Sequence, residues 1–261
     1  MVGLALKSGG DVELRLSGPN GPEVCRARAI VLCAGTVENA RIVSQISEET
    51  RSFPIVDHHV QGWLCAVERH LFGGDSHDAS VLVAHDHSDR INVFTEIHHI
   101  GERDVIDTWS MGEQIPTIKT QLIFDDGPDD IRFDVKLTRE DDAVLSAQAL
   151  FLAAVADSME LKLETPISPY RTLGFNEALK RAMARPGVAV PYHCPLGNTD
   201  HESCTLPLGG HIVGSDTKLR NIPSVFVTGP CLFPRAGAAN PSLTTLALSK
   251  YSARQIVAEL G

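Results

Sequence analysis

Histidines are the side chains most able to do chemistry in this 261-residue sequence, which contains 11 of them. An imidazole titrates near neutral pH and can serve as a general base or as a metal ligand. Eight lie in the middle of the chain among aspartates, namely His58, His59, His70, His77, His85, His87, His98 and His99, with Asp75, Asp78, Asp86 and Asp89. His85 and His87 have the spacing that puts two rings on one face of a strand. No tighter ligand set such as H-E-x-x-H accompanies them, so we expect no metal site and keep this pair as the alternative.

A second candidate region combines a loop histidine with the start of a helix. His201 lies in the stretch 186–221, which is rich in Gly, Pro and His. Asn240 and Pro241 open a segment predicted to be helical to about residue 260, because proline suits the first helical position. Such a helix directs free amides and a positive dipole end toward whatever binds there. Taken alone, His201 could be a surface histidine, and Asn240 could simply cap the helix.

Other catalytic and metal patterns are missing from the sequence. No Gly-x-Ser-x-Gly occurs, which argues against a serine hydrolase of the α/β type. The six cysteines have irregular spacings and no C-x-x-C, so neither a structural zinc site nor a disulfide framework is predicted. We interpret most of them as small buried residues in a reducing cytoplasm, with a Cys194–Cys204 bridge as the alternative.

The charge balance limits the partners of the chain. It has 23 Lys and Arg against 33 Asp and Glu, a net charge of −10. Such a chain lacks the basic surface that nucleic acid or an anionic membrane would need. It also has no apolar run near the roughly 20 residues that span a bilayer and no signal-peptide pattern at its start. We therefore expect a cytoplasmic protein without nucleic-acid or membrane partners.

Two apolar runs that end in glycine predict part of a parallel sheet. Residues 29–35 and 224–229 are the runs, and their continuous apolar character fits strands covered on both faces. Thr36 is the predicted N-cap of a helix through Ile46. Ligands of such sheets sit beyond the carboxyl ends of the strands, so a ligand-binding α/β protein is predicted.

The rest of the chain predicts antiparallel strands and two further helices. An N-terminal hairpin is expected at 4–7 and 12–16, across a glycine turn. Alternating segments at 92–97, 118–124 and 131–137 indicate an antiparallel sheet with one solvated face. Thr138 should cap a helix that runs to about Leu163, and a short helix follows near 176–183.

Several segments together resemble the carboxyl-terminal part of the glucose-methanol-choline (GMC) family of flavin oxidoreductases. They are Ala29–Arg41 (AIVLCAGTVENAR), Asp57-His58, His201–Gly209 (HESCTLPLG), and Ser224–Gly229 followed by Gly237–Thr244 (GAANPSLT). Their order and spacing match the family, and the two ends of the chain match better than the middle. The Glu-Asn-Ala-Arg segment and the His/Asn pair look most like the sugar-oxidising branch.

The resemblance implies a site and a cofactor. It makes His201 the catalytic base that takes a proton from an alcohol, and Asn240 the partner that orients the hydroxyl. It implies FAD as the cofactor, held by residues at the ends of the two glycine-terminated strands and at the start of the last helix. Those cofactor-binding residues would be Gly35, Gly229, Pro230, Asn240, Pro241 and Ser242.

The sequence also departs from the family. Cys204 and Leu208 replace the loop glycine and methionine, and Gly229-Pro230 stands where many members carry Asp. The Gly-x-Gly-x-x-Gly turn that holds the ADP part of FAD is not found in the sequence. We therefore expect a hetero-oligomer in which a partner chain supplies that Gly-rich half, or else a truncated remnant.

These observations lead to one interpretation and one alternative. The fold class is α/β, a partial FAD-binding Rossmann-like domain with an inserted antiparallel substrate-binding sheet. Residues 1–56 would belong to the FAD-binding domain, 57–190 to the substrate-binding domain, and 191–261 to the histidine loop with the closing strand and helix. The implied function is FAD-dependent oxidation of a sugar or polyol hydroxyl. The alternative is a non-catalytic substrate-recognition or structural subunit with the same fold.

Overall fold

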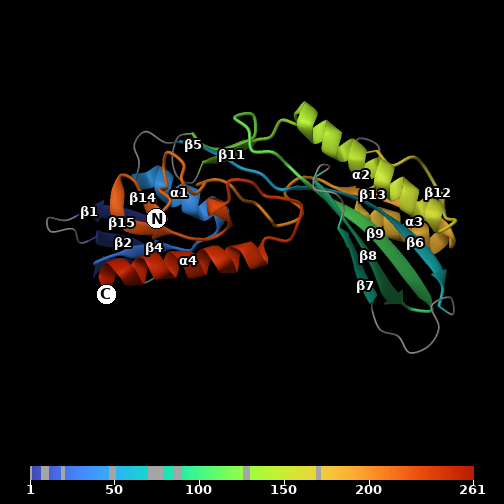
Figure 1. Cartoon of the computed structure of the whole chain (residues 1–261), viewed down its shortest axis with the longest axis horizontal. Helices are drawn as coiled ribbons and strands as arrows, with labels where there is room; N and C mark the ends of the chain where they lie inside the picture. The colour runs from blue at the N-terminus through green and yellow to red at the C-terminus, as the bar shows by residue number, and fades with distance from the viewer. Residues whose placement is uncertain are drawn as a thin grey trace.

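The computed structural model describes residues 2–6, 12–18, 21–46, 51–69, 79–84, 90–125, 130–168 and 172–261. These residues form two lobes, which lie side by side in Figure 1. The lobe on the left contains the first and last segments of the chain in small sheets with two helices. The lobe on the right is a larger sheet with two helices. The predicted mixed α/β class is confirmed.

The parallel pair predicted from the glycine-terminated runs is present in the left lobe. β4 (Ile30–Leu32) and β15 (Ile222–Val227) run in parallel, with Ile30 opposite Val225. β14 (Lys218–Leu219) lies on the other side of β15. Each parallel strand leads toward a helix, α1 (Thr36–Ile46) after β4 and α4 (Ser242–Leu260) after β15.

The prediction that residues 29–35 form a strand buried on both faces is wrong. β4 has three residues and forms the edge of its sheet. Val31 is 40% exposed, and Cys33 and Gly35 are also exposed. No other part of the described chain covers this edge, so the apolar run meets solvent here.

The starts of both helices differ by one residue from the prediction. Thr36 is the first residue of α1 rather than its cap, and its hydroxyl donates to the Glu202 carbonyl at 2.6 Å. α4 begins at Ser242, with Pro241 in the capping position that we assigned to Asn240. The reason is that the Pro241 carbonyl accepts the first helical bond, from the Thr245 amide at 2.8 Å.

Two antiparallel sheets complete the left lobe. The predicted N-terminal hairpin is confirmed and extended to three strands, β1 (Val2–Leu6), β2 (Val12–Gly18) and β3 (Gly21–Ala27). The second sheet has β5 (Ser52–Pro54), β10 (Gln121–Phe124) and β11 (Ile131–Asp134), in the order β11-β10-β5.

The position of this second sheet is another correction. We placed the segments 118–124 and 131–137 in the same sheet as 92–97, but they pair with β5 instead. Leu122 and Phe124 are fully buried in the core that β4 and α1 share, so the apolar face of this hairpin belongs to the left lobe. An alternating pattern shows which face is buried but not which sheet it joins.

The right lobe is one six-stranded sheet in the order β12-β13-β6-β9-β8-β7. Its strands are β6 (His58–Glu68), β7 (Ala79–Ala84), β8 (Ile91–Ile100), β9 (Arg103–Glu113), β12 (Lys162–Leu163) and β13 (Val188–Cys194). All neighbours are antiparallel except β12 and β13. This sheet is inserted between β4 and β15 in the sequence, as predicted.

Helices cover both faces of this sheet. α2 (Arg139–Ser158) packs on the face that carries Trp63, whose indole donates to the Leu152 carbonyl at 3.1 Å. α3 (Phe175–Ala184) packs on the opposite face, where Ala178 and Ala182 bury against Leu64 and Tyr192. The shared central strand β6 is buried along nearly its whole length.

The start of α2 was predicted correctly and its end was not. Thr138 is the cap as predicted, and with Asp141 it forms a capping box, in which each side chain satisfies a backbone amide of the other. The helix ends at Ser158, about one turn before the predicted Leu163, because Glu160 takes a positive φ of 56° and the chain turns into β12. The predicted short helix near 176–183 is confirmed as α3.

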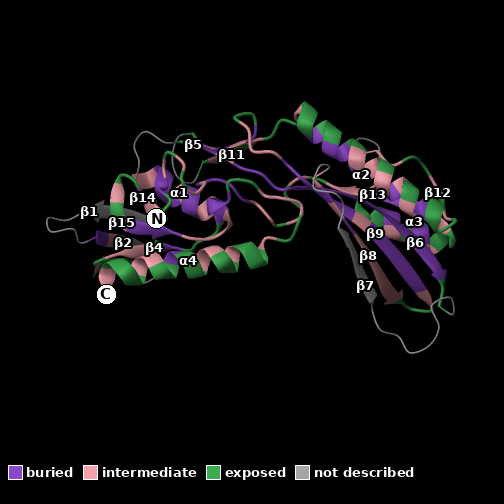
Figure 2. Cartoon of the chain, viewed as in Figure 1, coloured by how far each residue is buried: buried purple, intermediate pink, exposed green. Residues whose placement is uncertain are grey.

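α4 is the helix with the least cover. Only Ser252 of its 19 residues is buried, and Leu243, Leu246 and Val257 are 79%, 68% and 69% exposed. Figure 2 shows α4 as green and pink along its length, in contrast to the mostly purple strands β6 and β9 of the right lobe. A helix whose apolar side chains face solvent usually meets another surface, so α4 and the edge of β4 together form an open face.

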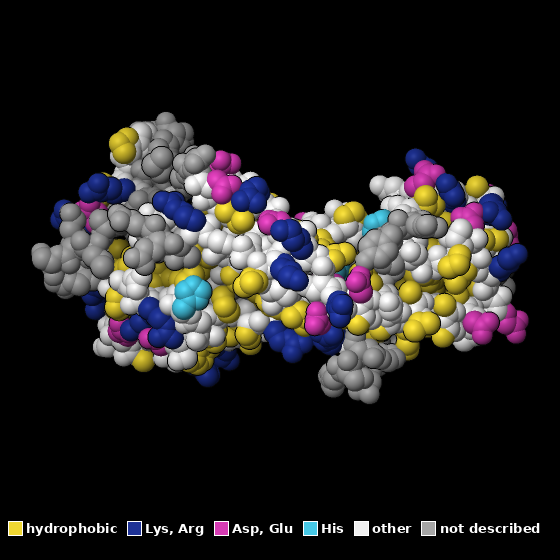
Figure 3. Space-filling view, turned by 90° about the horizontal axis from the view of Figure 1, so that it is seen from above, with side chains coloured by type: hydrophobic (Ala, Val, Ile, Leu, Met, Phe, Trp, Pro, Cys, Tyr) yellow, Lys and Arg dark blue, Asp and Glu magenta, His cyan; other side chains and the backbone are white. Residues whose placement is uncertain are grey.

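The surface and the cysteines agree only in part with the prediction. Acidic and basic side chains are interspersed on the face in Figure 3, without a large basic patch there. None of the helices in the described ranges is both long and apolar enough to cross a membrane.

All six cysteines are free thiols, so the Cys194–Cys204 bridge is not formed. Three are buried, but Cys25 and Cys33 are exposed rather than packed inside.

Candidate active site

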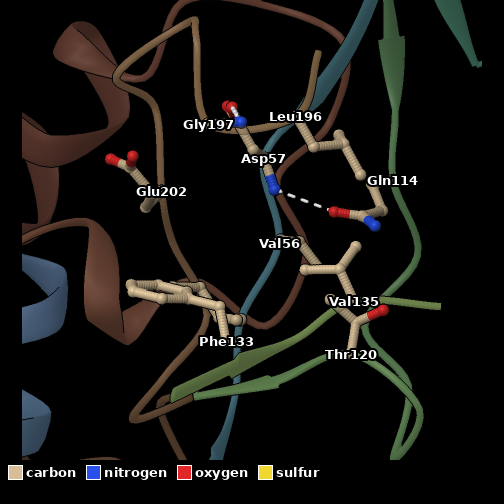
Figure 4. Close-up of a pocket in the computed structure, with 10 residues that line it drawn as sticks. Val56, Asp57, Gln114, Thr120, Phe133, Val135, Leu196, Gly197 and Glu202 are labelled. Carbon is tan, nitrogen blue, oxygen red and sulfur yellow. Dashed lines mark hydrogen bonds between the residues drawn. The ribbon is translucent and has the colours of Figure 1, made fainter. Parts of the chain in front are cut away.

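The loop that carries His201 is tied to the start of β6. Asp57 is buried, and its carboxylate accepts hydrogen bonds from the Gly197 amide at 2.7 Å and from the Thr199 hydroxyl. The Asp57 amide donates in turn to the Gln114 side chain at 3.0 Å, the dashed line in Figure 4. Val56 and Ser203 exchange backbone hydrogen bonds of 2.9 and 3.2 Å. Two connections therefore position the residue between them, His201.

His201 packs against a second histidine, His58. Their ring centroids are 5.2 Å apart and their planes are nearly perpendicular, at 89°. His58 is 1% exposed, and neither of its ring nitrogens has a hydrogen-bond partner within the described ranges. The Nδ1 atom of His201 is also buried without such a partner. Two imidazoles thus meet where the two lobes join.

Burial keeps His58 neutral. Desolvation lowers its pKa from 6.5 to about 4, although the nearby Asp57 carboxylate opposes this shift. His201 adds to the lowering, because two adjacent imidazoles resist carrying charge together. At neutral pH, His58 therefore contributes no positive charge beside His201.

A short segment before α4 is held against the large sheet. The Glu113 carboxylate, at the end of β9, accepts from the Arg235 guanidinium at 2.9 Å and from the Gly237 amide at 3.2 Å. Asn92 of β8 donates to the Ala238 carbonyl. Glu113 is 3% exposed and raises the pKa of Arg235, so the Arg235 guanidinium stays charged. These contacts fix the approach to Asn240.

Asn240 lines a cavity of about 500 Å³ between this segment and the large sheet. The cavity has polar and charged walls from both lobes, with Arg90, Asn92 and Glu113 on one side and Arg235, Asn240 and Thr244 on the other. His201 is not among the residues that line this cavity. The structure therefore places His201 beside His58 and Asn240 at a neighbouring cavity, and the predicted pairing of the two stays a prediction.

A second cavity of about 340 Å³ lies on the other side of the Asp57 contacts. Figure 4 shows Val56, Phe133, Val135 and Glu202 around it, together with Asp57. Its walls are mostly apolar and come from β11, the segment between β5 and β6, and the histidine loop. None of the residues predicted as catalytic or cofactor-binding lines it.

The two predicted glycines have backbone conformations that suit close approach of a ligand. Gly35 and Gly229 follow the parallel strands with φ angles of 90° and 116°, which side-chain-bearing residues rarely adopt. A Cβ atom placed on either would have no atom within 4 Å, so both backbones border open space. Pro230 begins a 3-10 turn after Gly229, and Ser242 begins α4.

Asn39 is a site residue that the sequence analysis missed. It is fully buried in α1, accepts from the Ala34 amide at 3.0 Å and donates to the Thr228 carbonyl at 3.2 Å. It thereby joins the turn after β4 to the turn after β15, where Gly35 and Gly229 lie. The sequence offered one signal for Asn39: it occupies a position of the predicted helix that the spacing of the apolar residues places on the buried face.

Cys204 stands where the family pattern has a glycine, and the structure shows how a side chain fits there. It has a φ of 71°, in the left-handed region that glycine adopts without strain. Its thiol is buried, and burial raises its pKa to about 12, so it is not a nucleophile at neutral pH. A side chain at this position is therefore accommodated at some cost in backbone strain.

Together, the parallel glycine-terminated strands and the inserted antiparallel sheet define a mixed α/β fold with a histidine loop between the lobes. No family model matches the sequence. The chain is 37% identical to a C-glycoside 3-oxidase of Arthrobacter globiformis over 87 residues, which are 31% of this chain and 17% of that protein. Its structure is similar to the crystal structure of pyridoxine 4-oxidase from Mesorbium loti, with a TM-score of 0.60 and 16% identity.

The sequence match covers less than a third of this chain, and the structural match shows a shared fold; both agree with the predicted resemblance to the GMC family. The structural match covers 97% of this chain but 56% of the pyridoxine 4-oxidase chain. The chain thus spans little more than half of that structure, and less of the sequence relative.

Proposed function

We propose that this chain provides the substrate-binding sheet and catalytic residues of an FAD-dependent oxidoreductase that acts on a CH–OH group of a sugar or polyol. The observation that carries the proposal is the position of His201, held by the Asp57 and Ser203 contacts against a neutral histidine. A base at this position can take the hydroxyl proton, because no positive charge on His58 competes with it.

Asn240 would orient the substrate from the neighbouring cavity. Its amide can hydrogen-bond the alcohol oxygen, and the backbone amides at the start of α4 can stabilise negative charge next to it. The contacts from Glu113 and Asn92 to the segment before Asn240 hold that amide in place.

The residues at the ends of the parallel strands fit the flavin part of FAD. Gly35 and Gly229 leave open space beside the backbone. When bound, FAD would supply the hydride acceptor for the alcohol carbon.

Within the sequence, nothing provides the Gly-rich turn for its ADP part. The open face at β4 and α4 would receive the half that carries this turn, which we propose comes from a partner chain.

Two observations support a sugar or polyol as the substrate. The sequence relative is a C-glycoside 3-oxidase by name. The cavity beside Asn240 has amide, carboxylate and guanidinium groups on its walls, which can hydrogen-bond several hydroxyls at once.

The visible absorption spectrum of the purified chain, before and after FAD is added and removed by desalting, tests the cofactor assignment. We expect no retained flavin band without the Gly-rich half, and a retained band once that half is present. Alcohol-dependent bleaching of the flavin in the complex then tests the reaction. A complex that binds FAD but is bleached by no sugar or polyol would contradict the proposal.

The competing function is a non-catalytic recognition subunit, and the strained Cys204 favours it. In that case, the complex would keep its flavin bleaching when His201 is replaced. The bleaching measurement, repeated with a His201 variant, therefore separates the two functions.

A further inference from the structure

We propose that Glu96, His98 and Asp107 form a binding site for one divalent transition-metal ion on the large sheet, apart from the oxidoreductase site. Glu96 lies directly opposite Asp107 in the β8–β9 ladder, and His98 is two residues further along β8. Because side chains alternate across a strand, all three project from the same face.

The three ligand atoms already converge. His98 Nε2 is 3.5 Å from a Glu96 carboxylate oxygen and 4.0 Å from Asp107 Oδ2, and all three atoms lie within 4.8 Å of one another. Ligand atoms bonded to one zinc ion at about 2.0–2.2 Å would be roughly 3.3 Å apart. Rotation of the half-exposed Glu96 and His98 side chains can supply the difference, while the strands stay in place.

A buried hydrogen bond orients the third ligand. Tyr192, 3% exposed, donates its hydroxyl to Asp107 Oδ1 at 2.9 Å, which leaves Oδ2 turned toward His98. Tyr192 cannot move easily, because its ring lies directly over Gly62, where a Cβ would come within 2.7 Å of it. Metal ligands in proteins are commonly fixed by such an outer partner.

The charges at this site favour a cation. Asp107 is 5% exposed, and burial raises its pKa to about 6, with the Tyr192 hydroxyl and His98 opposing the shift. Glu96 brings a second carboxylate within reach. A divalent ion would neutralise both carboxylates at a position where the ionised Asp107 is otherwise poorly solvated.

The ligand types indicate the ion. One imidazole nitrogen and two carboxylate oxygens suit zinc or manganese, whereas calcium prefers oxygen ligands alone. Three protein ligands leave room for water, because Glu96 and His98 remain partly exposed. Asp107 is six residues from Glu113 along β9, about 20 Å at 3.3 Å per residue, so the ion would join β8 to β9 without reaching the site beside Asn240.

Zinc titration of the metal-free chain by isothermal calorimetry tests the site without using enzyme activity. We expect one zinc ion per chain and an increase in melting temperature on binding. His98→Ala should weaken binding at least tenfold, and Tyr192→Phe, which keeps all three ligands, should weaken it by roughly 10-fold to 100-fold.

His211→Ala is the matched control, because His211 is exposed and lies in a loop of the other lobe. Circular dichroism of each variant in metal-free buffer verifies that it is folded. Absence of stoichiometric binding, or binding that His98→Ala and His211→Ala weaken equally, would overturn the proposal. Neither result depends on whether the chain is an oxidoreductase.

Discussion

His58 and His201 are neighbouring residues of one type in different surroundings. His58 lies inside the sheet with no hydrogen-bond partner in the described ranges, whereas His201 is half-buried in a loop tied down on both sides. At neutral pH the first is therefore restricted to its neutral form, and the second is the residue that we propose as the base. Two predictions follow from this difference.

Replacing His201 by Asn should remove the base but keep a polar side chain of smaller size. We expect alcohol-dependent flavin reduction in the assembled complex to fall by about 10²- to 10⁴-fold, the usual contribution of a general base. Stopped-flow absorbance at the flavin band measures this rate. His211→Asn, in an exposed loop, should leave it unchanged, and an equal effect of both variants would argue against the base assignment.

His58 should make the unfolding free energy depend on pH. Its pKa is 6.5 in the unfolded chain and about 4 when folded, so the unfolded state binds more protons between these values. The stabilisation is present above pH 6.5 and is lost as the pH falls to 4, with a total of about 3 kcal/mol.

Asp107 opposes this trend, because its raised pKa of about 6 makes the folded state hold a proton that the unfolded state releases. Urea unfolding of the chain and of His58→Phe between pH 4 and pH 7, with a chelator present, separates the two effects. The difference in slope between the two proteins belongs to His58. Parallel curves would show that His58 does not titrate on unfolding.

At the scale of elements, single polar side chains connect pieces that are distant in sequence. Asn39 bonds to the turns after both parallel strands, although Thr228 is 189 residues away. Asp141 caps α2 and also bonds to His59 of β6 at 3.0 Å. In both cases a helix terminus is attached to a strand by one side chain, so its loss should affect more than the helix.

Asn39→Ala should lower the unfolding free energy by roughly 2–3 kcal/mol, because the Ala34 amide and the Thr228 carbonyl lose a buried partner. FAD affinity of the assembled complex should fall with it, since Gly35 and Gly229 would no longer be held together. Chemical denaturation and flavin titration measure the two effects. Asn176→Ala, at an exposed position of α3, is the control and should change neither.

Thr138→Ala should remove one half of the capping box of α2 and destabilise the chain by about 1 kcal/mol. Ser146→Ala, on the exposed side of the same helix, should change stability by less than about 0.5 kcal/mol. Thermal unfolding of both variants gives the comparison. A larger loss for Ser146→Ala would contradict this role of the cap.

The elements that could be predicted from the sequence are those with local signals. The Thr138 cap, the N-terminal hairpin and the glycine-terminated strands each depend on residues a few positions apart. The Glu113–Arg235 pair spans 122 residues, and no local pattern indicates it. The sheet to which β10 and β11 belong was also unpredictable, because it depends on the burial of Leu122 against another lobe. Family resemblance proposed His201 and Asn240 as site residues, which stays a prediction, and it did not indicate His58 as the neighbour of His201.

At the scale of the whole molecule, the open face at β4 and α4 is the dominant feature. An edge strand with unpaired backbone groups and a helix with exposed leucines invite association. Leu246 and Leu248 lie two residues apart on α4, but Leu246 is 68% exposed whereas Leu248 packs against the core. They make a matched pair for testing what this face does.

Leu246→Glu should reduce self-association of the chain in sedimentation velocity and should weaken its binding to the Gly-rich half, while the melting temperature stays unchanged. Leu248→Glu should instead lower the unfolding free energy by roughly 2 kcal/mol or more, because it places a carboxylate against apolar residues. If Leu246→Glu destabilised the isolated chain to the same extent, α4 would already be covered within this chain.

The parallel pairing of β4 with β15 also has a kinetic consequence. Ile30 pairs with Val225, which is 195 positions further along the sequence, among the longest separations in the fold. Closing so long a loop is entropically unfavourable until the large sheet has formed and shortened the distance between its ends. The right lobe should therefore fold first, and the strand pair beside Gly35 and Gly229 should form last, after most of the protein is already in place.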